Sequence, residues 1–240
     1  MNTIKIANKG NTKMVAHRGV SSIERENTSA AFIAAGNRSY YGIETDLHRT
    51  ADGAMVTIHD GRTGRVSPVD VSVEDSRLAD LRKINLFDTH GLFTRGDLVI
   101  PTLAEYAAIC HDYEKVSILE LKSSFTKEDI AEILTILQTQ EQLEHTVFIA
   151  FDIRNLYLIR EFLPTHPVQF LTSTLSEEIL EHLIARRMDL DVKYTALTKE
   201  WVDRFHAAGL KINCWTVDDP DCCRTLIDWG VDYITSNCLE

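Results

Sequence analysis

The sequence contains no long hydrophobic run and no stretch rich in proline, glycine or serine. No segment approaches the roughly 20 apolar residues of a membrane-spanning helix, and the N-terminal MNTIKIANKGNTK lacks the apolar core of a secretory signal peptide. At 240 residues the chain is long enough for one large domain, and no linker divides it. We therefore expect a single cytoplasmic domain over residues 1–240, without a membrane span.

Positive charge is also scarce. Lys and Arg number 25 against 36 Asp and Glu, which gives a formal net charge of -11. This balance argues against a nucleic-acid partner, because such a partner needs a basic face. An anionic substrate must then be held by locally placed cations. The five cysteines include no CxxC pair, which favours a reducing compartment, and we interpret Cys222 and Cys223 as ordinary helix residues.

The chain does contain an alternation of short apolar segments with helical stretches. The segments predicted as strands are 14–17, 42–46, 116–120, 146–150, 168–172, 192–195, 211–215 and 232–235. Strands that alternate with helices predict an α/β protein with a parallel sheet, and eight such units predict a closed (β/α)8 barrel, or TIM barrel.

Several helix boundaries are also visible in the sequence. TLAE, from Thr102 to Glu105, matches a capping box, and TKED, from Thr126, and SEE, from Ser176, resemble other helix starts. Gly209 and Gly230 stand where helices are expected to stop before strands.

A ninth strand candidate, residues 55–59, does not fit this alternation. Eight residues separate it from Asp46, too few for a helical crossover, and the connection contains Asp52-Gly53, a strong hairpin signal. A two-residue turn centred on this pair puts position 46 opposite position 59. The sequence therefore predicts a β-hairpin after the second strand, with His59 beside Asp46.

The segment after the hairpin, residues 61–100, contains a helical run around Ser76–Ile84. We expect it to be a small insertion over the carboxyl-terminal face of the barrel. In this fold the carboxyl ends of the strands form the active-site face.

Three carboxylates are expected on that face. Glu44 and Asp46 stand two apart at the end of a strand and share one face, and Glu120 and Lys122 repeat the pattern on the next strand. Like charges inside a barrel need a cation or a proton, and three convergent carboxylates suit one divalent ion, Mg²⁺ or Ca²⁺. Two alternatives stay open: a solvated acidic pair at 44 and 46, and a purely structural Glu120–Lys122 salt bridge.

Two histidines end neighbouring segments of the same face. MVAHRGV stops the first strand on His17 and Arg18, and His59 ends the hairpin arm. Histidine suits proton transfer near neutral pH, so the pair predicts one base and one acid, although each alone also fits a packed or surface histidine. Arg18 and Lys122 are candidate phosphate ligands. His48 is expected to point away from the interior.

Taken together, these motifs resemble those of the glycerophosphodiester phosphodiesterase family, within the phosphatidylinositol-phospholipase-C-like phosphodiesterase superfamily. The similarity runs from about residue 14 to residue 236 through VAHRG, ENTSAAF, GIETDLHRTADG, TIHDG, IPTLAEY, ILELK, CWTVDD and GVDYITS. Two departures concern Arg25-Glu26-Asn27-Thr28, where the family usually has Pro-Glu-Asn-Thr, and Ser236-Asn237, where an aspartate is frequent. These departures leave the alcohol half of the substrate open.

The resemblance also implies a role for each site residue. The catalytic acid–base pair is His17 and His59, the metal ligands are Glu44, Asp46 and Glu120, and the phosphate ligands are Arg18 and Lys122. Trp215, at the end of a strand, would form an apolar wall of the site; the same residue also fits a plain core position.

We therefore expect a metal-dependent enzyme that splits a small-molecule glycerophosphodiester into glycerol 3-phosphate and an alcohol. No Ser, Thr or Cys in the motifs has the strand–turn setting of a protein nucleophile, so the attacker is water or the substrate's own 2-hydroxyl. Gly19, which has no side chain, is expected to leave room beside the protein backbone for the phosphodiester. The alternatives are a lysophospholipase D-type enzyme acting on lipid head groups and a catalytically retired barrel used for binding.

Overall fold

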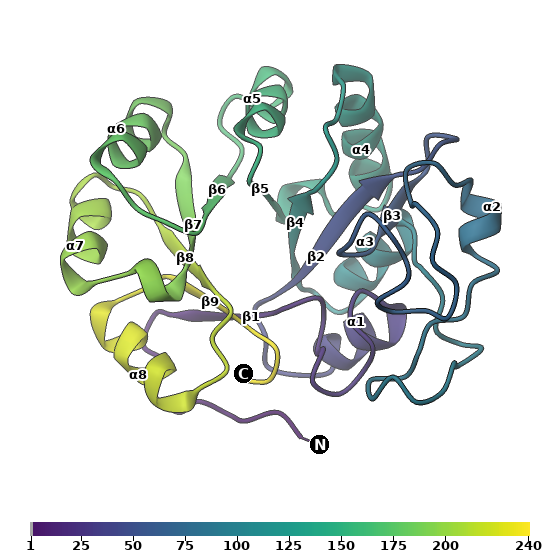
Figure 1. Cartoon of the computed structure of the whole chain (residues 1–240). Helices are drawn as coiled ribbons and strands as arrows, with labels where there is room; N and C mark the ends of the chain where they lie inside the picture. Colours follow the sequence, from purple (N-terminus) through teal and green to yellow (C-terminus); the bar gives the residue numbers. More distant parts are fainter. Residues whose placement is uncertain (1) are drawn as a thin grey trace.

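The computed structural model describes residues 2–240 and contains a closed barrel of eight parallel strands surrounded by helices (Figure 1). The barrel strands are β1 (Lys13–Ala16), β2 (Gly42–Arg49), β4 (Val116–Leu121), β5 (Thr146–Ala150), β6 (Val168–Thr172), β7 (Asp189–Lys193), β8 (Ile212–Trp215) and β9 (Tyr233–Ser236). Strand β1 pairs with β2 on one side and with β9 on the other, which closes the barrel. The predicted TIM-barrel class is confirmed.

The helices lie outside the strands (Figure 1). They are α1 (Ser29–Gly36), α2 (Leu78–Leu81), α3 (Leu103–Asp112), α4 (Lys127–Thr139), α5 (Ile153–Phe162), α6 (Glu177–Arg186), α7 (Lys199–Ala207) and α8 (Pro220–Trp229), with short 3₁₀ turns η1 (Leu143–His145) and η2 (Tyr194–Ala196). None of the helices within residues 2–240 has the length and apolar character that crossing a membrane requires.

Most of the predicted helix boundaries are present. Thr102 and Glu105 form a reciprocal capping box, Ser176 caps α6, and Gly230 ends α8 with a φ of 90°. The helical run predicted around residues 76–84 is shorter than expected: α2 has only four residues. Its N-cap residue, Arg77, makes no side-chain hydrogen bond that would stabilise the start of a longer helix.

One barrel strand was predicted wrongly. The expected strand 192–195 begins at Asp189 and ends at Lys193, where the chain turns into η2. Leu190 and Val192 pack in the main core, whereas Asp191 is buried on the alternate face. The two aspartates concealed the strand, because a polar residue inside a barrel breaks the expected apolar run.

The hairpin is present, but its register differs from the predicted one. Strand β3 (Met55–Thr57) runs antiparallel to β2 with Leu47 opposite Thr57. Position 46 therefore lies opposite position 58 and not 59, and the Ile58 amide donates to the Asp46 carbonyl at 3.0 Å. The turn has three residues and not two, because Gly53 takes a left-handed conformation with a φ of 84°.

The insertion, residues 61–100, packs against the loop that follows β1. Arg65 bonds to Glu26, Arg95 to Glu24, and Arg25 to the Phe87 carbonyl. The insertion also builds a small apolar core with residues of β3. That residues 1–240 form one domain stays a prediction, which these contacts favour.

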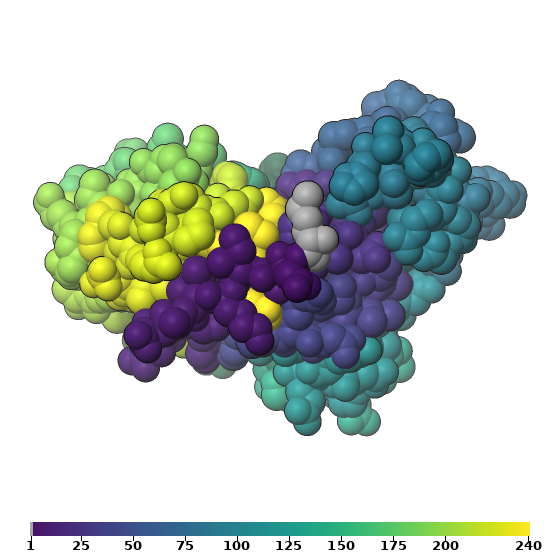
Figure 2. All heavy atoms as spheres, turned by 90° about the horizontal axis from the view of Figure 1, so that it is seen from below, coloured from purple at the N-terminus to yellow at the C-terminus, as the bar shows by residue number. Residues whose placement is uncertain are grey.

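The pairing of the two chain ends was not predicted from the sequence. Residues 4–6 pair in parallel with residues 238–240, so the N-terminal segment runs alongside the C-terminal one (Figure 2). The Thr3 hydroxyl donates to Glu240 Oε1 at 2.6 Å. This pairing ties the first residues of the chain to the strand that closes the barrel.

Candidate active site

A cavity of about 190 Å³ opens at the carboxyl ends of the strands and contains most of the predicted site residues. Its lining includes His17, Arg18, Glu44, His59, Glu120, Lys122 and Trp215. Asp46 completes the set from just behind this surface, between Arg18 and Lys122. The structure thus brings together all the residues that the sequence analysis selected.

The end of β1 is held by a turn that directs the Arg18 backbone at a carboxylate. Arg18 has a φ of 55°, and its amide donates to Glu44 Oε2 at 2.8 Å. Gly19 serves this turn and does not make room for substrate, which corrects the expectation. A Cβ on Gly19 would lie 2.6 Å from the Ala31 backbone, so the glycine lets the turn pack against α1.

The three predicted carboxylates converge. Asp46 of β2 pairs with Glu120 of the neighbouring strand β4. Glu44 lies two residues before Asp46 and therefore on the same face of β2. Each of the three offers an oxygen within 4.8 Å of the others. Asp46 Oδ1 has no hydrogen-bond partner within residues 2–240. A set of three buried oxygen ligands suits a hard divalent cation.

Burial and mutual repulsion control the charge of this group. Burial, followed by the Asp46 charge, raises the pKa of Glu44 well above its ordinary value and that of Glu120 to about 7. Burial acts on Asp46 too, but the charges of Arg18, His59 and Lys122 prevail and lower the pKa of Asp46 to about 2. Without a cation, the three groups therefore do not all ionise at neutral pH.

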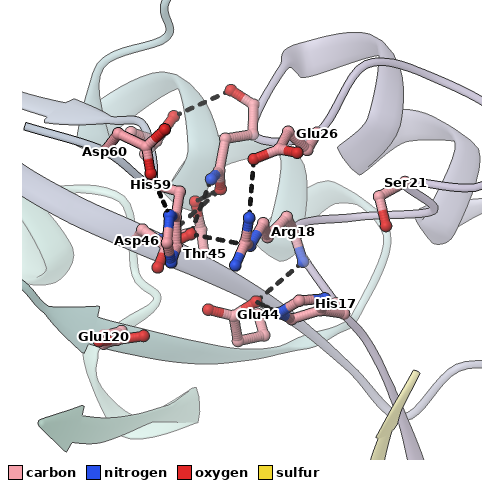
Figure 3. Close-up of polar contacts among 12 residues, drawn as sticks. His17, Arg18, Ser21, Glu26, Glu44, Thr45, Asp46, His59, Asp60 and Glu120 are labelled. Carbon is pink, nitrogen blue, oxygen red and sulfur yellow. Dashed lines mark hydrogen bonds and ion pairs between the residues drawn. The ribbon is translucent and has the colours of Figure 1, made fainter. Parts of the chain in front are cut away.

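Two cations stand next to the carboxylates. Arg18 Nε lies 3.4 Å from Asp46 Oδ2, and Lys122 Nζ lies 3.6 Å from Asp46 Oδ1 and 3.1 Å from Glu120 Oε1. Figure 3 shows Arg18 between Glu26 and the carboxylates of β2. Both cationic side chains line the cavity, where an anion can reach them.

His17 is oriented by an amide from the last strand's end. Its Nδ1 lies 2.8 Å from Asn237 Oδ1, and Asn237 Nδ2 donates to Asp218 Oδ2 at 2.6 Å. Because Asp218 fixes the amide, the Asn237 oxygen faces His17, and His17 Nδ1 carries the hydrogen. Burial, followed by the Arg18 charge, lowers the pKa of His17 to about 4. His17 Nε2 is then unprotonated.

His59 reaches the cavity although the predicted register was one residue out. The chain leaves β3 after Thr57, so strand alternation no longer determines the direction of the side chain. His59 Nδ1 lies 2.6 Å from Asp60 Oδ1, and Arg65 Nε donates to Asp60 Oδ2 at 2.5 Å. Burial lowers the pKa of His59, while the Asp46 charge opposes that effect.

Four supporting residues were missed. Glu26 accepts from both Arg18 and Arg65, Asp60 holds His59, and Asn27 Nδ2 donates to Asp46 Oδ2 at 2.8 Å. Glu26, Asn27 and Asp60 stand within the motifs quoted above, so the signal was present. Arg65 stands in the insertion and had no motif to mark it.

His48 packs behind His59. It lies outside the cavity lining, but it is buried and not directed to solvent, with 5% of its surface exposed. Its Nε2 lies 3.2 Å from the His59 carbonyl oxygen, and its Nδ1 lies 3.2 Å from Glu74 Oε1. His48 therefore supports the backbone of His59 from behind.

The opposite side of the cavity is apolar except at its floor. Ile149, Phe151 and Leu171 line it with Trp215, and the Phe151 and Trp215 rings meet edge to face at 5.8 Å. Asp191 of β7 completes this side. The cavity thus has one charged wall for an anion and one apolar wall for carbon atoms.

Comparisons with known proteins agree with this arrangement. Residues 17–240 match the glycerophosphoryl diester phosphodiesterase family. A glycerophosphodiester phosphodiesterase of Caldanaerobacter subterraneus is 28% identical over 94% of both chains, and one of Bacillus altitudinis is 27% identical over 93% of both.

Solved structures give the same picture. A phosphodiesterase of Oleispira antarctica, in complex with the product sn-glycerol-3-phosphate, superposes with a TM-score of 0.85 at 25% identity, covering 94% of this chain and 92% of that one. A glycerophosphodiester phosphodiesterase of Parabacteroides distasonis has a TM-score of 0.79 at 27% identity, with 95% and 93% coverage. From the family match over nearly its whole length, the chain belongs to the glycerophosphoryl diester phosphodiesterase family and is a phosphodiesterase.

Proposed function

We propose that the protein hydrolyses glycerophosphodiesters to glycerol 3-phosphate and an alcohol, in a reaction that depends on one divalent cation and two histidines. The observation that carries this proposal is the single cavity in which three carboxylates, two cations and two histidines meet. The product bound to the Oleispira antarctica relative supports the same substrate class. The cytoplasmic location expected from the sequence remains part of this proposal.

The metal ligands in this proposal are Glu44, Asp46 and Glu120. Their buried oxygens fit a hard divalent ion such as Mg²⁺ or Ca²⁺. Asp46 Oδ1 makes no hydrogen bond within residues 2–240 and lies 3.6 Å from the Lys122 ammonium, so it is available as a ligand atom. When bound, the ion supplies positive charge that draws the three carboxylates together and makes a phosphodiester more electrophilic.

Arg18 and Lys122 hold the phosphate. Arg18 is fixed through its backbone by Glu44 and through its guanidinium by Glu26, so its remaining N–H groups are oriented before substrate arrives. Lys122 adds a point charge from β4. Both groups stabilise negative charge as it grows on the phosphoryl oxygens.

The partners of the two histidines support a separate role for each. His17 carries its hydrogen on Nδ1 against a neutral amide, so its free Nε2 accepts a proton from the attacking hydroxyl. His59 stands against the Asp60 carboxylate, which offsets part of the lowering of its pKa by burial, and the Asp46 charge acts in the same direction. In this proposal His59 gives a proton to the leaving alcohol.

The attacking group in this proposal is the glycerol 2-hydroxyl. Well-oriented intramolecular attack reaches effective molarities of roughly 10⁵–10⁸ M, an advantage that free water lacks. The first step forms a bond between the 2-hydroxyl oxygen and phosphorus and releases the alcohol. Water then opens the cyclic phosphate, with the two histidines in reversed roles.

The histidine roles are tested with alanine variants and two leaving groups. His17→Ala and His59→Ala should each lower kcat by about 10²–10⁴-fold on a diester with an alkyl alcohol. On a diester of p-nitrophenol, whose anion leaves without a proton, His59→Ala should recover most of its kcat and His17→Ala should not. If His17→Ala recovered its kcat instead, His17 would be the acid and His59 the base. If neither variant recovered its kcat, the acid–base assignment would be wrong. Circular dichroism checks that both variants fold.

The cyclic route is tested with a substrate whose 2-hydroxyl is replaced by hydrogen. Its kcat should fall by several orders of magnitude while it still competes with the parent for binding. Comparable kcat values for the two substrates would exclude the cyclic route and leave direct attack by water.

The rival functions are less well supported. A retired binding barrel has no reason to keep all eight predicted residues around one cavity. A lysophospholipase D-type activity needs room for an acyl chain, and the cavity of about 190 Å³ favours a smaller substrate.

A further inference from the structure

The floor of the cavity contains a carboxyl group that the proposed reaction does not use. Asp191 of β7 lines the cavity with 2% of its surface exposed. Asn213 Nδ2 donates to its Oδ2 at 3.3 Å, but its Oδ1 has no hydrogen-bond partner within residues 2–240. A buried polar atom left unpaired is destabilising, so this oxygen is a candidate for contact with a ligand.

The surroundings of Asp191 favour its neutral form. Asn213 also donates to Gln169 Oε1 at 3.2 Å and accepts from the Thr235 hydroxyl, so this network is composed of neutral groups. Burial, followed by the Glu120 charge, raises the pKa of Asp191 well above its ordinary value. A neutral carboxyl offers one donor and one acceptor, which matches a hydroxyl group.

A second unpaired atom favours a hydroxyl ligand over an ammonium group. Trp215 Nε1 is buried and also lacks a hydrogen-bond partner in the described part of the chain. An indole N–H can only donate, so it needs an acceptor, and an ammonium group has none. A hydroxyl group can accept from Trp215 or bond with Asp191, so the two unpaired groups together indicate a polyol.

We propose that Asp191 binds the terminal hydroxyl of the substrate's glycerol and thereby selects glycerophosphodiesters whose glycerol carries no acyl chain. The inference rests on the proposed function. The glycerol carbons would lie along Trp215 and Leu171, with the phosphate at Arg18. The departing alcohol must leave through the mouth, so the closed floor suits the glycerol half. An ester at the terminal position cannot donate to Asp191, and its chain exceeds the cavity.

The test compares two substrates and two proteins. The parent is a glycerophosphodiester, and the analogue contains propane-1,2-diol in place of glycerol, which keeps the 2-hydroxyl and removes the terminal one. The wild-type kcat/KM should be about 10–100-fold lower on the analogue. On the parent, the kcat/KM of Asp191→Ala should be lower than that of the wild type by a similar factor. On the analogue, the kcat/KM values of the variant and the wild type should differ little. A 1-acyl lysophospholipid should not be turned over.

Two controls keep the result specific. Asp191→Asn retains a donor and an acceptor, so it should keep more of the parent kcat/KM than Asp191→Ala. Asp189→Asn removes a carboxyl from the same strand outside the cavity lining, where Asp189 accepts from the Lys211 amide, and should leave the substrate ratio unchanged.

Two outcomes would overturn the proposal. The first is equal wild-type kcat/KM on both substrates, a result that needs no variant to fold. The second is an equal loss by Asp191→Ala on both substrates, which would make Asp191 a structural residue only. Turnover of the parent by the wild type tests the proposed function separately. Calorimetry tests the same contact without turnover. The wild type should bind glycerol 3-phosphate more tightly than the analogue that lacks the terminal hydroxyl, and Asp191→Ala should bind the two alike.

Discussion

Buried carboxyl groups enter the barrel from two walls, and only one wall also carries cations. Glu44 and Asp46 of β2 lie near Arg18 and Lys122, whereas Asp191 of β7 has neutral hydrogen-bond partners. The β2 pair was predictable because two acidic residues two apart share a strand face. Asp191 was missed although Asp189 stands two positions before it, because the predicted strand began only at residue 192 and left both aspartates outside it.

The isolation of Asp191 has a consequence for stability. An unfolded carboxyl ionises near pH 4, but burial raises the pKa of Asp191 well above that value in the folded protein. The folded state therefore holds the extra proton, and stability falls as pH rises above about 4, by up to about 1.4 kcal/mol per pH unit, until the folded pKa is passed. Asp191→Asn cannot ionise. Its free energy of unfolding should exceed that of the wild type by a margin that grows as the pH rises from about 4 toward the folded-state pKa of Asp191.

Urea unfolding of both proteins across that range measures the margin. A margin that stays constant with pH would show that Asp191 has an ordinary pKa in the folded state.

Among the helices, strands and turns, features encoded by a few neighbouring residues were predicted correctly, whereas features that depend on tertiary contacts were not. The capping box at Thr102 and Glu105 lies within one turn of chain, so the sequence contains all of it. The three-residue hairpin loop was misjudged, because the same Asp52-Gly53 pair fits a two-residue turn or a longer one. The start of β7 was missed because Asp189 and Asp191 interrupt its apolar pattern.

The turn between β1 and α1 gives a prediction at this scale. Gly19 has a φ of 76°, and a Cβ there would lie 2.6 Å from the Ala31 backbone. Gly19→Ala should therefore lower the free energy of unfolding by about 2–5 kcal/mol through strain and overpacking. Chemical denaturation measures this change. Gly96→Ala is the matched control, since a Cβ on Gly96 meets nothing within 4 Å; equal small effects at both positions would contradict the packing argument.

For the whole molecule, alternation of strands and helices was enough to predict a closed barrel. The same alternation brought His17, Glu44 and Glu120 together, because the carboxyl ends of parallel strands meet at one face. The contacts between the insertion and the loop after β1 could not be predicted from the sequence. Arg65 meets Glu26 across 39 positions, and no periodic pattern connects two loops of that separation.

Metal removal tests the molecule as a whole. Excess EDTA should abolish turnover, and Mg²⁺, Mn²⁺ or Ca²⁺ should restore it, because Glu44, Asp46 and Glu120 repel one another without a cation. The ion should also raise Tm in proportion to the logarithm of its concentration above Kd. Full activity in a rigorously metal-free preparation would refute the metal assignment, and a Tm rise that survives Glu44→Gln with Glu120→Gln would place the ion elsewhere.

The contact between His17 and Asn237 links the first barrel strand to the end of the last, across 220 positions. During synthesis on the ribosome, His17 emerges long before Asn237. The proposed base can acquire its orienting amide only after β9 has left the exit tunnel and docked between β1 and β8. A chain that has not closed its barrel therefore lacks the contact that orients the proposed base, and the proposed site becomes complete only when β9 docks.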